Sequence, residues 1–583
     1  MRYLNIILSL LLIVIVSALF NSGTLWQIDM GNYGFDGIVI GLEASPLSSF
    51  FATLISFSWF IISIVLIEED SGSETFIRWL PILTLSLILI VYASDYLLFF
   101  VGWEIMSITT YIILSSTLTR EVLIKYIIFA MTSALSIFMA IVILYSGIGS
   151  LLYVDGHLSF MALSDNMKIA LVIFMLLGIF IKMGTIGFHY WLVDSYEGAD
   201  NLFTPYLSAV LSKMGVYALI ILLLEVIDIE SLNSLYLQYF LAIMGLMTSI
   251  IATFKAIRES DAKRLLAYSS IAQLGYILTV LSVADGVSGA VYHALIHTLV
   301  KLLLFINIAG IIMVTGRSKF GELGGLIYRM PHSFVMGLIG IIVLAGMPPL
   351  GGFASKYLIY TTLLDEKLLL TLSAMMFASV SSFLYVYKFI YGVYLGQPTN
   401  QKLESVDEVS IYYMIPQYIL SIILIIIGTL PAVVVPYLNQ ILTQFNLSTI
   451  EYNSTTTLSS NIGSYNGLVV MFALIVVLLT ILVGLYSIKN RAREAKDRFD
   501  IAYCGEEPNQ TTPLHYGYSL GEELKRVGFI KIIWQNSTSH FYNALSKMTT
   551  NLSLVTSKIY SGNLVINFHI AIIFATLLLW WRI

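Results

Sequence analysis

The amino-acid sequence predicts an all-α membrane protein with about fifteen transmembrane helices. Of the 583 residues, 58% are hydrophobic and only 11% are charged, so a water-soluble fold could not cover its apolar surface. Apolar stretches close to the roughly 20 residues that cross a bilayer recur almost from end to end. The bilayer is therefore the expected solvent for most of the chain.

Each predicted span is an apolar run bounded by polar positions. In chain order the spans are 3–20, 47–67, 76–93, 96–116, 122–146, 167–187, 205–226, 238–257, 266–283, 289–315, 333–364, 368–395, 411–433, 467–488 and 562–581. The first run continues into residues 21–23 without the small-residue pattern of a cleavable signal, so we expect a membrane helix there. The run 333–364 is too long for one straight helix and contains Pro348-Pro349 and Gly351-Gly352, which predicts a helix broken at membrane depth.

The segment between the last two spans has a different composition. Residues 517–560 place apolar side chains at spacings near three and four, with lysines and polar residues between them. This pattern predicts an amphipathic lateral helix along the membrane surface or along other subunits. We therefore expect N-terminal helices over 1–75, additional helices over 396–488, a cytoplasmic tail over 489–561 and a C-terminal anchor over 562–583.

Basic residues fall on alternate connections between the spans, and the positive-inside rule places those connections in the cytoplasm. They are Arg120, Lys255, Arg258, Lys263, Arg264, Arg317, Lys319, Arg329, Lys402, Lys489, Arg491, Arg493, Lys496 and Arg498. The loops at 21–46, 147–166, 227–237, 284–288 and 434–466 carry almost none. We expect a cell (inner, cytoplasmic) membrane location with the N-terminus inside and Ile583 outside.

Redox cofactors are not expected in this chain. Cys504 is the only cysteine, which excludes a disulfide framework or a cysteine-ligated iron–sulfur cluster built from this chain alone. There is no phosphate-binding loop or dinucleotide fingerprint. We predict no catalytic residues, cofactor or metal site, and no nucleic-acid partner.

Seven of the ionisable side chains inside the predicted spans form a candidate series, and a charge there costs at least about 2.5–3.5 kcal/mol. They are Glu104, Lys182, Lys213, His293, His297, Lys301 and Lys356. Two histidines and Lys301 follow one another at steps of four, so they share one face of their helix. Lys356 comes directly after the predicted break.

These residue types suit proton transfer. Burial of an ammonium group depresses its pKa by up to about 3–5 units, and a nearby carboxylate raises it again. A glutamate–lysine pair is therefore a two-position switch, in which the lysine keeps its proton beside the glutamate and passes it on after separation. Neutral imidazole can take a proton on one nitrogen and release one from the other. The series predicts a proton-translocation path.

Structural explanations remain open for each residue. Glu104 and Lys182 could form an ion pair between helices, Lys213 could extend toward a nearby surface, and each histidine could complete hydrogen bonds in a packed bundle. Asp95 and Lys125 lie near span ends, where solvated charges are expected. The number of buried charges in one chain favours a functional explanation.

Six ordered motifs over roughly residues 45–395 resemble one membrane-protein family. The motifs are Phe99–Ser107, Phe188–Asp194, Thr204–Ala209, Asp261–Tyr276, His293–His297 and Met347–Lys356. They resemble the antiporter-like proton-pumping subunits of respiratory complex I, of Mrp antiporters and of energy-converting membrane-bound hydrogenases of the Ech or Hyf type. The Tyr503–Glu506 stretch is similar to the large membrane subunit of those hydrogenases.

The resemblance implies two inverted five-helix repeats, at 76–226 and 238–395, each with one broken helix. It implies that Glu104 and Lys182 form the switch pair, that Lys213, His293, His297 and Lys301 lie in mid-channel, and that Lys356 is the exit residue. Thr204-Pro205 keeps only part of the family's proline-rich loop, and the first helices are compressed.

The residues and the resemblance together predict a proton-translocating subunit of a multisubunit redox complex, either an energy-converting hydrogenase or a complex I-like oxidoreductase. Its partners would be other antiporter-like subunits and the quinone or hydrogenase module, and the ion would be H⁺, with Na⁺ as the other candidate. One alternative is a stand-alone or Mrp-type Na⁺/H⁺ antiporter subunit, which needs carboxylates and carbonyls around a dehydrated ion. Another is a structural anchor for a soluble enzyme.

Overall fold

The computed structural model describes residues 1–20, 22–30, 38–68, 74–227, 236–396, 403, 405–452, 454–460 and 462–488, with scattered residues between 524 and 554. It divides into two units, Met1–Glu523 and Leu524–Ile583. The predicted lateral helix within 489–561 and the anchor at 562–583 fall almost entirely outside the described residues.

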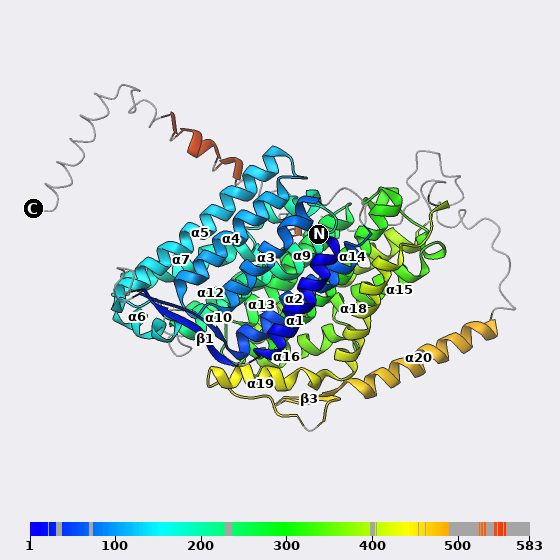
Figure 1. The fold of residues 1–583 in the computed structure, drawn as a ribbon. Helices are drawn as coiled ribbons and strands as arrows, with labels where there is room; N and C mark the ends of the chain where they lie inside the picture. Colours follow the sequence, from blue (N-terminus) through cyan, green and yellow to red (C-terminus); the bar gives the residue numbers. More distant parts are fainter. Residues whose placement is uncertain are drawn as a thin grey trace, which may run out of the picture. The chain divides into compact units, whose positions relative to one another are not determined.

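The first half of the larger unit is helical apart from one hairpin (Figure 1). Strands β1 (Gly23–Asp29) and β2 (Val39–Ala44) pair antiparallel. The helices are α1 Arg2–Ala18, α2 Pro46–Val65, α3 Glu74–Tyr92, α4 Tyr96–Leu114, α5 Arg120–Ile148, α6 Gly156–Ala162, α7 Asp165–Met183 and α8 Tyr190–Gly198. A continuous helical run then comprises α9 Phe203–Tyr206, the π-helix η3 Leu207–Leu211, α10 Ser212–Ile221 and the π-helix η4 Leu222–Ile227.

The second half repeats this helical character. Its helices are α12 Leu237–Arg258, α13 Ala262–Val280, α14 Gly286–Thr315, α15 Pro331–Ala345, α16 Gly351–Asp365, α17 Leu369–Ile390 with the π-helix η7 Tyr391–Leu395, α18 Ile411–Thr429, α19 Val435–Gln444 and α20 Gly467–Ile488. Short 3₁₀ turns occur at Tyr153–Asp155, Phe320–Glu322, Leu326–Tyr328 and Pro431–Val433. Strands β3 Thr457–Ser459 and β4 Ser464–Asn466 form a second hairpin.

The helical class predicted from the sequence is confirmed. Each predicted span from 3–20 to 467–488 overlaps a helix, and the run 333–364 overlaps two, α15 and α16. Within the described residues, ten helices are long and apolar enough to cross a membrane, and α1, α15 and the segment Gly467–Val483 of α20 are shorter apolar helices. The two small hairpins lie in predicted loops and were not expected.

The predicted break in the run 333–364 is present between α15 and α16. The first helix ends at Gly346, whose φ of 81° is left-handed and favours glycine. The run 167–187 also ends early, at Gly184 with φ 68°, and the chain turns before α8 begins.

Asp95 is not the solvated charge expected at a span end. Its side chain is 0% exposed and accepts hydrogen bonds from the backbone N–H groups of Leu98 (2.8 Å) and Gly41 (2.9 Å). It therefore caps α4 and ties that helix to β2. Lys125 is also paired, at 3.0 Å from Asp194 on α8.

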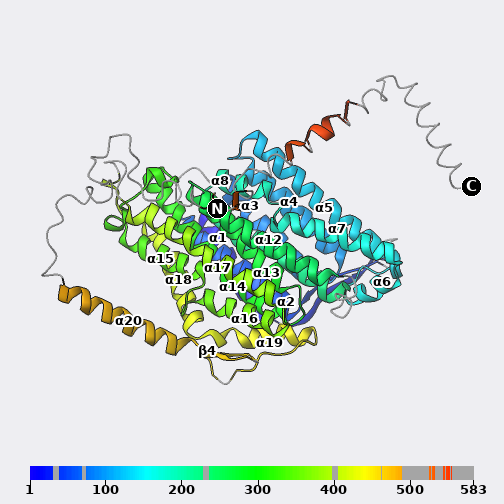
Figure 2. The same cartoon turned by 180° about the vertical axis from the view of Figure 1, so that it is seen from behind.

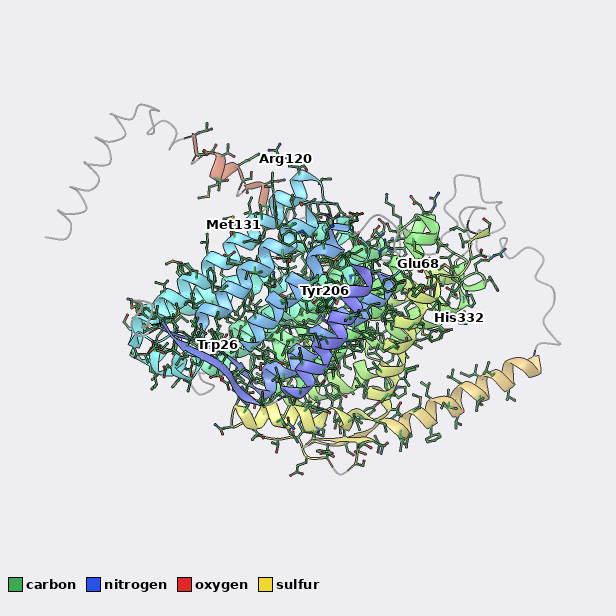
Figure 3. All side chains as sticks on the ribbon, viewed as in Figure 1. Trp26, Glu68, Arg120, Met131, Tyr206 and His332 are labelled. Carbon is green, nitrogen blue, oxygen red and sulfur yellow. The ribbon has the colours of Figure 1, made fainter. Side chains whose placement is uncertain are left out.

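Helix α14 lies in the interior and packs against α13, α15, α16 and α18 (Figure 2). It is buried along most of its length, from Gly286 to Ile311. In contrast, α5 exposes apolar side chains at helical spacing, including Met131, on its outer face (Figure 3). Tyr206 points into the interior, where its hydroxyl lies 2.9 Å from the Thr84 hydroxyl.

Candidate functional site

Glu104 and Lys182 form the first part of the site. Glu104 lies on α4 and is half-buried, whereas Lys182 lies in the last turn of α7 and is 5% exposed. The two groups interact electrostatically, although no described ion pair joins them directly. The Lys182 amine also lies 5.7 Å from the centre of the Trp103 ring. A cation at this end of α7 is favourable because the last carbonyls of a helix carry partial negative charge.

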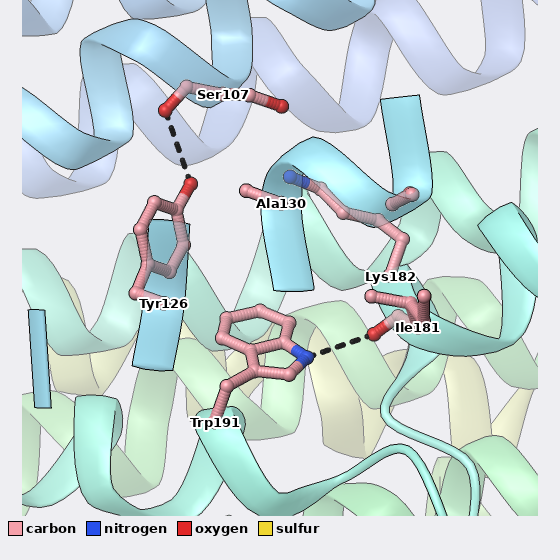
Figure 4. A pocket seen from close by; sticks show the side chains of 7 residues that line it. Ser107, Tyr126, Ala130, Ile181, Lys182 and Trp191 are labelled. Carbon is pink, nitrogen blue, oxygen red and sulfur yellow. Dashed lines mark hydrogen bonds between the residues drawn. The ribbon is translucent and has the colours of Figure 1, made fainter. Parts of the chain in front are cut away.

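A small cavity of about 10 Å³ adjoins Lys182 (Figure 4). Its other lining residues are Ser107, Tyr126, Ala130, Ser133, Ile181 and Trp191. The Tyr126 hydroxyl donates to the Ser107 carbonyl (3.1 Å), and Trp191 Nε1 donates to the Ile181 carbonyl (3.0 Å). These bonds fix α4, α5, α7 and α8 around the amine, with space for about one water molecule.

Lys213 lies on α10 and is 1% exposed. Its amine donates to the Ser208 carbonyl at 2.9 Å, and the Ser212 hydroxyl donates to the same oxygen at 2.8 Å. Ser208 belongs to the π-helix η3, and such irregular turns inside helices often mark functional positions. Within the described part of the chain the amine thus bonds to this carbonyl and to the Ser212 hydroxyl (3.4 Å), and to no carboxylate.

Two serines connect Lys213 to Lys301 on α14. The Ser208 hydroxyl lies 3.0 Å from the Ser270 hydroxyl, which donates to the Leu266 carbonyl at 2.9 Å. Lys301 donates to the same carbonyl at 2.9 Å and to the Ser269 hydroxyl at 2.6 Å. The two amines thus bond to backbone carbonyls on either side of the Ser208–Ser270 hydroxyl contact.

The two histidines on α14 stack, with ring centres 6.4 Å apart. His293 Nε2 lies 3.0 Å from Gln273 Oε1, and Nδ1 lies 2.9 Å from the Ser355 hydroxyl. Both ring nitrogens of His297 are buried without a hydrogen-bond partner among the described residues. A cavity of about 10 Å³ adjoins both rings, so one water molecule there could bond to His297.

Lys356 lies beside the break between α15 and α16 and is 2% exposed. Its amine donates to the Ala345 carbonyl at 2.8 Å and to the Ser379 hydroxyl at 3.1 Å. Ala345 is the last residue of α15, so the break supplies the carbonyl that the amine satisfies. The Leu344 carbonyl accepts from both Lys356 (3.5 Å) and Gln273 Nε2 (3.4 Å), which links the amine to His293.

Five of the seven predicted residues therefore lie together. Electrostatic interactions connect Lys301 with Lys213, Lys213 with both histidines, and His293 with Lys356. We call this set the interior series: Lys301, Lys213, His297, His293 and Lys356. The Glu104–Lys182 pair is separate, since no described hydrogen bond links it to Lys213, although α7 and α10 pack closely where Gly215 meets Met183.

The sequence did not single out the polar residues that connect the series. These are Ser208, Ser270, Gln273, Ser355 and Ser379. Serines in membrane helices often bond only to a carbonyl of their own helix, as Ser58 does to Leu54. The presence of a serine in a span therefore does not indicate a contact between helices. The spacing of Ser269, Ser270 and Gln273 along one apolar helix is the sequence pattern that could have identified polar residues of this kind.

Comparisons with known proteins identify related membrane subunits. A family described as "NADH:quinone oxidoreductase/Mrp antiporter, TM" matches residues 93–382. NADH-quinone oxidoreductase subunit N 2 of Syntrophobacter fumaroxidans is 29% identical over 404 residues, covering 67% of this chain and 83% of that protein. NADH-quinone oxidoreductase subunit L of Rickettsia felis is 30% identical over 341 residues, covering 56% of this chain and 52% of that protein.

Among solved structures, a chain of the membrane-bound sulfane sulfur reductase, an archaeal respiratory membrane complex, matches with a TM-score of 0.87. It is 26% identical, and the match covers 99% of this chain and 95% of that one.

Proposed function

Because the chain belongs to the antiporter-like family of NADH:quinone oxidoreductase and Mrp antiporter membrane subunits, we propose that it translocates protons within a multisubunit redox complex. Moving one proton against the membrane potential requires about 2.3 kcal/mol per 100 mV. Electron transfer in partner subunits would supply that free energy. The similarity to a chain of an archaeal respiratory membrane complex supports such an assembly.

The interior series is the observation that carries this proposal. Its three amines and two imidazoles are buried, and hydroxyls, an amide and backbone carbonyls lie between them. Like charges in a low-dielectric interior repel strongly, so a proton that enters at one amine favours release from the next. A series of this composition can pass a positive charge along the membrane interior.

The geometry around His293 supports its role as a two-sided carrier. Gln273 Nε2 donates to Leu344, so its Oε1 faces the ring and accepts from His293 Nε2–H. Nδ1 of the neutral ring then accepts from the Ser355 hydroxyl. After protonation Nδ1 donates to Ser355, whose hydroxyl can turn to the Gly352 carbonyl 3.2 Å away. Both protonation states of His293 thus keep their hydrogen bonds.

In this proposal Glu104 and Lys182 form the switch. Lys182 holds its proton while the Glu104 carboxylate is close, and releases it toward the interior series when a partner subunit moves the carboxylate away. The water-sized cavity beside Lys182 provides a place for the first acceptor. Lys356 would then be the exit residue.

We further propose the finer architecture. It has about fifteen transmembrane helices, with N-terminal helices at 1–75, inverted repeats at 76–226 and 238–395, helices at 396–488, a cytoplasmic tail at 489–561 and an anchor at 562–583. The break after Lys182 and the break before Lys356 would be the interrupted helices of the two repeats. In a cell membrane the N-terminus would lie inside and Ile583 outside. Other antiporter-like subunits and a quinone or hydrogenase module would be the partners.

The test is Lys213→Met in the intact complex, assayed in membrane vesicles with its own electron donor. We expect the number of protons moved per electron to fall by about tenfold or more, since loss of a proton-transfer group has effects of that size or larger. Lys182→Ala should act in the same way. Lys263→Met is the matched control, because Lys263 is buried but bonds to Ala199 and Asn201, away from the series.

Full redox-driven acidification by an assembled Lys213→Met complex would contradict the proposal. Sodium-dependent proton flux in vesicles without an electron donor would favour the Mrp-type alternative.

A further inference from the structure

Tyr276 is an aromatic residue that lies against two members of the interior series. It belongs to α13, which packs against α14, α16 and α17 in the second half (Figure 2), and it is 1% exposed. Its ring centre lies 4.9 Å from the Lys356 amine and 6.0 Å from the centre of the His293 ring. The relay proposed above does not use this ring, although the ring touches both groups.

The packing of α13 fixes the position of the ring. Gly275 lies directly against the backbone of α12, because an added Cβ atom there would be 2.6 Å from the Ser249 nitrogen. Successive residues of a helix are turned by about 100°, so Tyr276 faces away from that contact. Its hydroxyl donates to the Met375 carbonyl on α17 at 3.1 Å. The ring is therefore held at both ends beside Lys356.

The Lys356 ammonium group has more donors than close hydrogen-bond acceptors. An ammonium carries three N–H donors. The Ala345 carbonyl at 2.8 Å and the Ser379 hydroxyl at 3.1 Å accept two of them, whereas the Leu344 carbonyl is 3.5 Å away, at the limit of a hydrogen bond. The negative face of an aromatic ring attracts a cation within about 6 Å. The Tyr276 ring therefore adds a contact that stabilises the charged amine.

The ring also distinguishes the two protonation states of Lys356. The Ser379 hydroxyl can accept from the ammonium or donate to the lone pair of the neutral amine, so it bonds to both states. The ring attracts the ammonium much more strongly than the neutral amine, because the attraction depends on the positive charge. A contact of this kind favours the ammonium by about twofold to thirtyfold. Unlike a carboxylate, it leaves no uncompensated charge when the proton departs.

We propose that Tyr276 is a positioning residue for the exit step, and that the face of its ring holds the Lys356 ammonium beside His293. This inference rests on the proposed function. An N–H bond forms on the Lys356 amine as a proton arrives from another group of the interior series, and an N–H bond of the ammonium breaks as water takes the proton. The ring stabilises the ammonium between these two events and binds no proton itself.

The test first compares Tyr276→Leu with Tyr276→Phe in the intact complex in vesicles with its own electron donor. Tyr276→Leu removes the ring, and we expect the number of protons moved per electron to fall by about twofold to thirtyfold. Tyr276→Phe keeps the ring and removes only the hydroxyl that bonds to Met375, so it should restore most of the loss. Equal losses in the two variants would overturn the inference, because the hydroxyl and not the ring would then be required.

A fluorinated series separates the charge of the ring face from its packing. Mono-, di- and trifluorophenylalanine, introduced at position 276 by nonsense suppression, keep nearly the same shape while the ring face becomes less negative. We expect the number of protons moved per electron to fall stepwise along the series. A side chain that only fills space would give a flat response. The series also decides the question if Tyr276→Leu does not assemble, because the ring is kept.

The same fluorinated series at Phe160 is the matched control. Phe160 lies on α6 in the first half, is 2% exposed, and has its ring centre 5.7 Å from the Lys168 amine. Fluorination there should leave proton transfer unchanged, because neither residue belongs to the interior series.

The failure of this inference can be told apart from the failure of the proposed function. A flat response at position 276, in assembled complexes in which Lys213→Met still reduces proton transfer, would overturn the role of the ring alone. Normal proton transfer in the fluorinated series and in Lys213→Met would reject the proposed function itself.

Discussion

At the residue scale, each amine of the interior series donates to a backbone carbonyl. Lys213, Lys301 and Lys356 bond to the carbonyls of Ser208, Leu266 and Ala345. A buried carboxylate partner would hold an ammonium in its charged form, because separating the pair leaves an uncompensated charge. A neutral carbonyl favours the ammonium over the neutral amine less strongly than a carboxylate does, so the proton can leave.

The contact between the Ser208 and Ser270 hydroxyls can be removed by one small substitution. Ser270→Ala takes away the hydroxyl between Lys213 and Lys301 without changing charge or adding volume. We expect slower redox-driven proton transfer, measured as vesicle acidification per electron, with recovery in Ser270→Thr.

Ser58→Ala is the matched control. Ser58 is equally buried, but its hydroxyl bonds only to the Leu54 carbonyl of its own helix. Equal acidification by the Ser270→Ala and Ser58→Ala complexes would show that the hydroxyl line carries no protons.

At the element scale, breaks and π-turns place the amines. Helix α15 stops at Gly346, and the chain begins α16 close enough for Lys356 to reach back to Ala345. The π-helix η3 lies at Ser208, where Lys213 finds its carbonyl. Such interruptions make backbone carbonyls available to these two amines, whereas Lys301 bonds to the Leu266 carbonyl within the regular helix α13.

Gly346→Ala tests the break. The new Cβ would lie 2.6 Å from Lys356 Cδ, at a left-handed φ of 81°. We expect loss of about 1–2 kcal/mol from the backbone strain alone, together with a displaced Lys356 and reduced acidification.

Gly149→Ala separates these two effects. Its φ is 74°, and nothing lies within 4 Å of the added Cβ. Both variants should lower the melting temperature in detergent, but only Gly346→Ala should reduce protons moved per electron in the assembled complex. Similar pumping in the two variants would mean that the Gly346–Lys356 contact has no functional role.

At the scale of the whole molecule, the interior around α14 is basic. The interior series contains three lysines and two histidines, and no carboxylate belongs to it. A dehydrated Na⁺ requires several oxygen ligands, usually including carboxylates, and neighbouring ammonium groups repel it. The charge distribution therefore favours H⁺ over Na⁺.

Redox-driven transport through this subunit should accordingly be insensitive to sodium. Vesicles of the intact complex with K⁺ replacing all Na⁺ should acidify at an unchanged rate. If transport strictly required Na⁺, and this requirement disappeared in a partner-subunit variant but persisted in Lys213→Met, the sodium site would lie in the partner subunit. If the Na⁺ requirement disappeared in Lys213→Met, the prediction would be contradicted.

The membrane class, the helices that underlie the predicted spans up to 467–488, the break after Ala345 and the seven ionisable residues, six of them buried and Glu104 half-buried, could be predicted from the sequence alone. Hydrophobic length and the cost of a charge in lipid are local properties, so they can be read along the chain. The same local reasoning failed at Asp95, because burial depends on a strand that is brought over it from residues 39–44.

The polar groups that join the ionisable ones follow from the packing of the helices and not from local sequence patterns. The Ser208–Ser270 and His293–Ser355 contacts each join residues 62 positions apart. A hydrogen-bonded path depends on distances of about 3 Å between side chains of different helices, and the packing of those helices sets such distances.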